Sequence, residues 1–125
     1  MEEIVEFEEQ NQFKKELEIK LPEAKTRKDQ LEVKADAYGH LISSLRYRLG
    51  GYKTLLKELV RLEQKTMEED DKEAVRLKSI FEITCEFDVF VKEYVRTLNT
   101  LEKVAEEREE NYRQLCQLRD KEKGE

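Results

Sequence analysis

The sequence is poor in residues that interrupt helices and in residues that build metal or disulfide sites. Its 125 residues include one Pro, four Gly, two Cys, one His and no Trp. Pro and Gly are the residues least compatible with a helix interior, so their scarcity permits very long helices. A single His cannot form a two-histidine metal site, and Cys85 and Cys116 are too far apart for a C-x-x-C pair. We expect no metal, no cofactor and no disulfide framework, and we expect two reduced thiols in or beside a helix seam.

Long uncharged apolar runs are also missing. No segment approaches the roughly 18 apolar residues that cross a membrane. The first residues, Met1-Glu2-Glu3-Ile4, are acidic where a secretory signal is basic. We therefore expect a soluble intracellular protein, cytoplasmic or nuclear.

The overall composition departs from that of a compact globular domain. Charged residues make up 43% of the chain and apolar residues 38%, against about 25% and about 45 to 50% in ordinary domains. A deep core is not expected, and disorder is the alternative that such a composition raises. The apolar residues are periodic, however, so we favour ordered helix for residues 24–118.

The clearest periodicity runs from about residue 70 to residue 119. Steps of three and four residues give apolar or aromatic side chains at ten of twelve positions, namely Leu77, Ile80, Thr84, Phe87, Val91, Tyr94, Leu98, Leu101, Ala105, Arg108, Tyr112 and Leu115. This pattern is typical of a heptad seam, and one helix cannot cover its own seam. It predicts coiled-coil-like packing against helices of the same chain or of another. Ile83 and Phe90 lie off this register, which predicts a second apolar face where further helices or a partner dock.

A second seam occupies the first half of the chain, through Leu31, Tyr38, Leu41, Leu45, Tyr52, Leu55, Leu59 and Leu62. Gly50-Gly51 interrupts it, and two glycines inside a helix cost about 2 kcal/mol relative to alanine. A turn between two helices at these glycines is the favoured interpretation, and it would place Lys34 beside Glu68. Because Leu45, Tyr52 and Leu59 stay in step across the glycines, a helix that continues through them is the rival interpretation. Residues 64–72 would then be either a polar interruption in one long helix or a hairpin loop.

Proline marks the first boundary of the chain. Pro22 removes a backbone donor and restricts Leu21, so one helix should end near Lys20 and another should begin at about Pro22. We predict a short amphipathic helix over residues 1–20, a helical hairpin or bundle over 22–118 and a frayed charged tail over 119–125. The fold class is all-α, an elongated antiparallel bundle or coiled coil with long helices.

Charge is unevenly distributed along the chain. The net charge is -5 over residues 1–24, +5 over 25–62 and -6 over 63–125. A phosphate-binding patch on the basic segment would use Arg46, Arg48, Lys53, Lys57 and Arg61. We favour the alternative that the basic segment neutralises the acidic ones in an antiparallel bundle.

No catalytic motif stands out. Carboxylate pairs such as Glu106-Glu107 are typical of solvated helix faces, whereas acid-base catalysis needs shielded carboxylates. Gly50-Gly51 lacks the flanking residues of a phosphate-binding loop. We therefore expect neither enzymatic activity nor a small-molecule substrate.

The uncovered seams favour an interaction or scaffold module. Such a chain would act through coiled-coil helices as a subunit of a cytoskeletal, trafficking or chromosome-associated assembly. Its partner would be a second copy or another helical protein, and we expect neither nucleic acid nor a membrane as a partner. A helical chaperone or binding cofactor is the second interpretation. A membrane-surface helical dimer is the third, which the net charge of -6 opposes.

Overall fold

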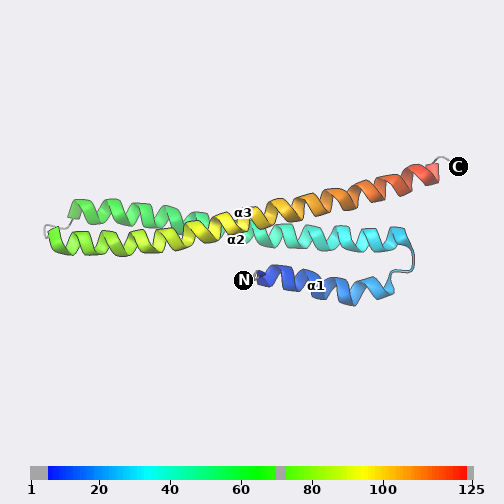
Figure 1. The fold of residues 1–125 in the computed structure, drawn as a ribbon, viewed down its shortest axis with the longest axis horizontal. Helices are drawn as coiled ribbons and strands as arrows, with labels where there is room; N and C mark the ends of the chain where they lie inside the picture. The colour runs from blue at the N-terminus through cyan, green and yellow to red at the C-terminus, as the bar shows by residue number, and fades with distance from the viewer. Residues whose placement is uncertain (1–5, 70–72, 124–125) are drawn as a thin grey trace, which may run out of the picture. The chain divides into compact units, whose positions relative to one another are not determined.

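The structure is a computed structural model that describes residues 6–69 and 73–123. These residues form three α-helices and one 3-10 turn and contain no strand: α1 (Glu8–Lys20), η1 (Leu21–Glu23), α2 (Arg27–Glu69) and α3 (Glu73–Lys123) (Figure 1). The predicted all-α class is confirmed. The side chains of residues 69, 73–78 and 122–123 lie outside the description, and Leu77 of the predicted seam is among them.

The first two helices begin where side chains satisfy backbone N–H groups. The Phe7 backbone N–H donates to Gln10 Oε1 at 2.9 Å, which is half of a capping box at the start of α1. The Asp29 backbone N–H donates to Thr26 Oγ1 at 3.0 Å, which caps α2. Because Thr26 supplies this cap, α2 begins at Arg27, while Pro22 lies in η1.

The predicted turn at Gly50-Gly51 is wrong, because both glycines lie inside α2. The connection between α2 and α3 falls on residues 70–72, outside the described residues. The structure sets Tyr52 against Phe90, with ring centroids 6.1 Å apart. Packing a large apolar side chain contributes about 1.5 to 3 kcal/mol, so a few such contacts offset the cost of two helical glycines, about 2 kcal/mol. Lys34 and Glu68 both belong to α2, so they are not neighbours on two helices.

The end of α3 lies beyond the predicted end of ordered helix. The helix continues to Lys123, whereas fraying was predicted from Arg119. Lys, Arg and Glu are good helix formers, and basic side chains near a helix C-terminus interact favourably with the helix dipole. A lack of apolar residues therefore does not end this helix.

The chain divides into two compact units, and unit 1 comprises Met1–Arg46 and Thr100–Glu125. In it, α1 and the ends of α2 and α3 share a core of buried Phe7, Leu41, Ile42, Leu45 and Val104. Asn111 Nδ2 donates to the Leu31 carbonyl at 3.0 Å, and Arg27 donates to Gln114. Since the partner number on α3 falls as the number on α2 rises, the two helices run antiparallel.

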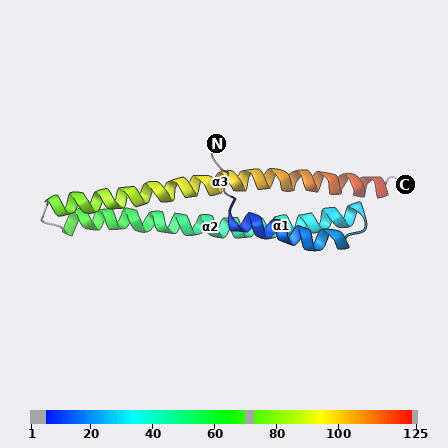
Figure 2. The ribbon, with the colours of Figure 1, turned by 60° about the horizontal axis from the view of Figure 1, so that its bottom comes forward.

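Unit 2 comprises Tyr47–Asn99, and its described residues belong to α2 and α3. Figures 1 and 2 show these two segments side by side. Its buried apolar side chains, among those described, are Leu59 and Ile83. Thr97 is also fully buried, and its hydroxyl donates to the Glu93 carbonyl at 2.7 Å. Unit 2 is thus a two-helix layer with a thin core.

The buried face of α3 agrees with the predicted seam at every second seam position and is shifted by one residue at the positions between them. Thr97, Val104 and Asn111 are buried, while the predicted residues that follow each of them, Leu98, Ala105 and Tyr112, are exposed. Both registers share Ile80, Phe87, Tyr94, Leu101, Arg108 and Leu115, which are buried or half-buried. From each of these shared positions, a step of three residues leads to one stripe of α3 and a step of four leads to the other, and both stripes are mostly apolar. Periodicity alone therefore does not show which stripe is buried. The burial of Thr97 and Asn111 is tolerated because their polar atoms are hydrogen-bonded.

Replacing Gly50 and Gly51 with alanine should stabilise the protein. Neither glycine has a positive φ, and a Cβ added at either would meet nothing within 4 Å outside the helix's own backbone. Each substitution should raise the free energy of unfolding by about 0.5 to 1 kcal/mol, because alanine loses less conformational entropy in a helix. Urea denaturation measures this change. Destabilisation by either substitution would indicate a turn at these residues instead.

The register of α3 is tested by two adjacent substitutions. Val104→Asp should destabilise the protein by several kcal/mol, because Val104 is 3% exposed and would become a buried unpaired carboxylate. Ala105→Asp places the same charge on an exposed position and should cost only about 0.7 kcal/mol of helix propensity. Thermal unfolding followed by circular dichroism compares the two. The reverse order of stabilities would support the predicted seam over the observed one.

Candidate interaction surface

The contact of α1 with α2 is a helix-docking surface within unit 1. Phe13 of α1 packs on Tyr38 with ring centroids 4.9 Å apart, and Phe7 is 5% exposed in the core. The face of α2 that contacts α1 is formed by Ala37, His40, Leu41 and Ser44. On α1, Glu8, Phe13 and Glu16 lie beside this face. In unit 1, therefore, a third helix covers the side of α2 that α3 leaves open.

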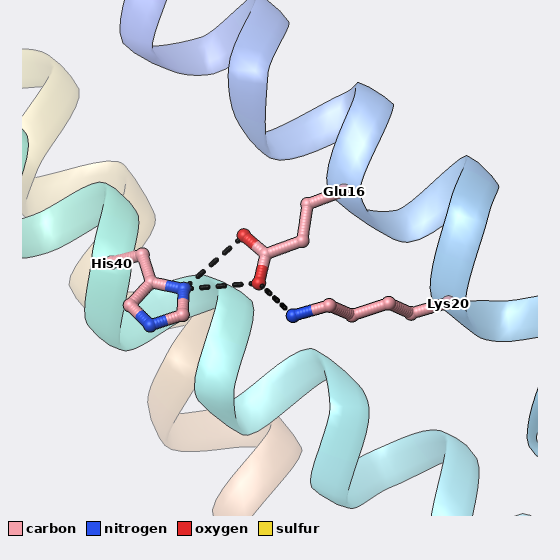
Figure 3. A network of polar contacts seen from close by, with 3 residues as sticks. All are labelled: Glu16, Lys20 and His40. Carbon is pink, nitrogen blue, oxygen red and sulfur yellow. Dashed lines mark hydrogen bonds and ion pairs between the residues drawn. The ribbon is translucent and has the colours of Figure 1, made fainter.

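A polar network lies at the edge of this contact. Figure 3 shows the Glu16 carboxylate between two basic groups, His40 Nδ1 at 2.9 Å and Lys20 Nζ at 3.0 Å. Partial burial opposes ionisation of Glu16, but the hydrogen bonds and charges of Lys20 and His40 hold its pKa below the ordinary value. Glu16 thus links α1 to α2 by a charge-assisted contact that the sequence did not reveal.

Unit 2 carries most of the exposed large apolar side chains. Of the eleven found among the described residues, nine belong to unit 2: Tyr47, Leu55, Val60, Leu62, Met67, Phe81, Val89, Val95 and Leu98. Unit 1, by contrast, holds eight of the ten buried apolar residues found among the described residues, Ala37 included. The difference follows from the helix count, because two helices cover each other along one line only.

An open groove of about 570 Å³ runs between α2 and α3 in unit 2. Leu55, Leu59, Leu62 and Phe90 form its apolar surface. Four charged residues complete it, namely Glu58, Arg61, Lys65 and Glu86. Arg61 Nη2 donates to Glu58 at 2.9 Å, yet its side chain remains 77% exposed.

The structure places the predicted seam residues in different environments. Leu45, Leu59 and Leu115 are buried, and Tyr52, Ile80, Phe87, Val91, Tyr94 and Leu101 are half-buried. Leu55 and Leu98 are 43% and 40% exposed. Ile83 and Phe90 belong to the surface where α2 and α3 meet, since Ile83 is buried and Phe90 contacts Tyr52. Phe90 also lines the open groove, and the second apolar face stays a prediction.

The structure places the five residues of the predicted basic patch in different environments, and the patch stays a prediction. Lys53, Lys57 and Arg61 are exposed and follow one another at steps of four, so they share a face of α2. Arg48 is half-buried and donates to the Tyr52 hydroxyl at 3.4 Å, and Arg46 belongs to unit 1. Intrahelical contacts with Tyr52 and Glu58 already engage two of the five basic side chains.

Other candidate chemistry is sparse over residues 6–69 and 73–123. No group of three or more His, Cys, Asp or Glu side chains within these ranges is arranged to hold a metal ion. Cys85 and Cys116 are free and exposed, so they lie on the outer surface of α3. No described helix combines the length and the apolar character needed to cross a membrane. Comparison of the chain with protein-family models, curated proteins and solved structures finds no match.

Sequence reasoning missed several residues of the docking surface and the groove. Ala37, Ser44, Lys65 and Glu86 belong to neither predicted seam, because small or charged residues carry no periodic apolar signal. Ala37 and Ser44 lie four residues before and three residues after Leu41, and Lys65 lies three residues after Leu62, so helical spacing from these leucines would have found three of the four. Only the packing of α1 against α2 shows that Ala37 and Ser44 belong to the docking surface.

Replacing Glu16 with Gln should lower stability at neutral pH and have little effect in acid. The folded pKa of Glu16 lies below its ordinary value of 4.5, so the folded state binds fewer protons than the unfolded state and stability rises with pH. The contribution of the pair, about 0.2 to 1 kcal/mol for partners this exposed, is present above the ordinary pKa and lost as the pH falls through the lowered one.

Urea denaturation at pH 7 and at pH 3 measures this difference. The matched control is Glu18→Gln, which removes one carboxylate from an exposed position of the same helix. Equal losses from both substitutions at pH 7 would contradict a specific role for the Glu16 contact.

Proposed function

We propose that this chain is a non-catalytic protein–protein interaction module that acts through packed helices as a subunit of a larger assembly. One observation carries the proposal: of the eleven exposed large apolar side chains among the described residues, nine belong to unit 2 and only Ile19 and Tyr112 belong to unit 1. Soluble monomers rarely expose contiguous apolar patches of more than a few hundred Å², and larger patches commonly mark interaction sites.

The kinds of exposed residue support a protein partner. Tyr47, Met67 and Phe81 are 87%, 56% and 69% exposed. Aromatic residues and Met are enriched in protein interfaces, where they bury a large area at a small number of positions. Each fully buried large apolar side chain contributes about 1.5 to 3 kcal/mol, so a partner that covers several of them gains binding free energy.

The two units would then have separate roles. Unit 1, with α1 packed over α2, supplies the stable core through Phe7, Leu45 and Val104. Unit 2 presents a two-helix surface whose exposed apolar residues would bind the partner. This division makes unit 2 the part of the chain to test for contacts with other proteins.

A photo-crosslinking amino acid at position 81 should form adducts with another protein in cells of the source organism. The matched control is position 112, because Tyr112 is also an exposed aromatic residue of α3 but belongs to unit 1. Positions 60, 62 and 89 sample other sides of unit 2. We expect discrete adducts from unit 2 positions, identified by mass spectrometry, and few from position 112.

The proposal fails if no position of unit 2 forms an adduct with protein. It also fails if position 112 forms the same adducts with the same yield, because the exposed surface of unit 2 would then have no special role. Adducts between two copies of this chain would support self-association as the form of the interaction.

A further inference from the structure

We propose that the groove of unit 2 binds one amphipathic helix of a partner protein, and that this helix has the pattern of α1: an aromatic residue followed three positions later by a carboxylate. The groove is the one lined by Leu55, Leu59, Leu62 and Phe90. This inference rests on the proposed interaction function and names the surface and the kind of partner.

The first argument is the repeat of α2. In unit 1, the residues of α2 that line the contact with α1 are Ala37, His40, Leu41 and Ser44. Three heptads later along α2 stand Glu58, Arg61, Leu62 and Lys65, and all four line the groove. Residues separated by whole heptads occupy equivalent positions relative to a packed neighbouring helix. The groove is therefore built from the positions that receive a helix in unit 1.

The apolar contacts repeat in the same way. Phe13 of α1 packs on Tyr38, and the equivalent position three heptads later is Leu59, a buried residue of the groove lining. Leu41 has Leu62 as its equivalent, which is 48% exposed. An aromatic side chain of the bound helix would cover Leu59 and Leu62 as Phe13 covers Tyr38.

The four charged residues of the groove, Glu58, Arg61, Lys65 and Glu86, carry no net charge, so position and not net charge favours a carboxylate on the bound helix. Arg61 and Lys65 stand where unit 1 meets a carboxylate of α1. In unit 1, the α1 carboxylate of Glu16 meets His40 at 2.9 Å. The equivalent of His40 is Arg61, and the equivalent of Ser44 is Lys65, so the groove offers permanent positive charge where unit 1 offers an imidazole and a hydroxyl. The exposed Arg61 guanidinium has further N–H donors besides the one engaged with Glu58, so it can bind a second carboxylate.

The α1 helix of a second copy is not the favoured occupant. In each chain, α1 is held in its own unit 1 by Phe7, at 5% exposure, and by the Phe13–Tyr38 contact. Moving it to another copy would uncover that core. A helix supplied by a different protein fills the groove without this loss.

The probe is a fluorescein-labelled peptide with the sequence of residues 6–23, titrated with the full chain and followed by fluorescence anisotropy. We expect saturable binding, weakened at least tenfold by Leu62→Glu. Val60→Glu is the matched control, because Val60 is 43% exposed and lies outside the groove lining, and it should change the dissociation constant less than twofold. Circular dichroism checks that both variants fold as the parent does.

Charge reversal supplies a second test that does not depend on Leu62. Arg61→Glu, at a largely exposed position, should weaken binding of the peptide severalfold. A peptide in which the residue corresponding to Glu16 is Lys should bind the Arg61→Glu chain better than the parent chain. This rescue distinguishes a direct contact from a general effect of charge.

Three results would overturn the inference. The first is no saturable binding, and the second is binding that Leu62→Glu leaves unchanged, as expected if the peptide only exchanges with α1. The third is a dimer, detected by light scattering, that Leu62→Glu dissociates and the peptide does not, which assigns the groove to a second copy. Protein adducts at position 81 would persist in each case, so failure of this inference is distinguishable from failure of the proposed function.

Discussion

The constraint on which this structure depends is that two packed helices cover each other along one line and leave both flanks of that line open. In unit 1, α1 covers one flank, and Phe7, Leu41 and Leu45 become buried as a result. In unit 2 only α2 and α3 are present, and Leu55 and Leu62 stay more than two-fifths exposed although they belong to the same apolar stripe. Similar residues on the same helix thus differ in burial because of the number of neighbouring helices.

The antiparallel pairing of α2 and α3 within unit 1 is specified by polar as well as apolar residues. Asn111 is 5% exposed and donates to the Leu31 carbonyl, a contact that a shift of the two helices along each other would break. An unpaired buried amide costs about 1 to 3 kcal/mol, so it penalises alternative registers about as strongly as the exposure of one buried leucine does. Asn111 therefore contributes to the choice of register even though it adds little apolar burial.

The all-α class, the great length of the helices and the break near Leu21-Pro22 could be predicted because each depends on local properties of the chain. The turn could not. Gly50-Gly51 has the stronger local signal for a helix end, and residues 64–72 contain neither Gly nor Pro. The helix continues through the glycines, and contacts between α2 and α3, such as that of Tyr52 with Phe90, are not part of the local signal. The same holds for the candidate groove, whose residues Glu58, Lys65 and Glu86 carry no periodic apolar signal.

The sequence by itself determined that this chain forms long amphipathic helices, because apolar spacing and the scarcity of Pro and Gly act within each helix. Only the tertiary structure decided which of two adjacent stripes on α3 is buried, since Val104 and Ala105 are both apolar and one residue apart. It also decided that α1 covers part of α2 around His40 and that the groove around Leu62 stays open. These outcomes depend on contacts between residues distant in the chain, whose free energies local periodicity does not contain.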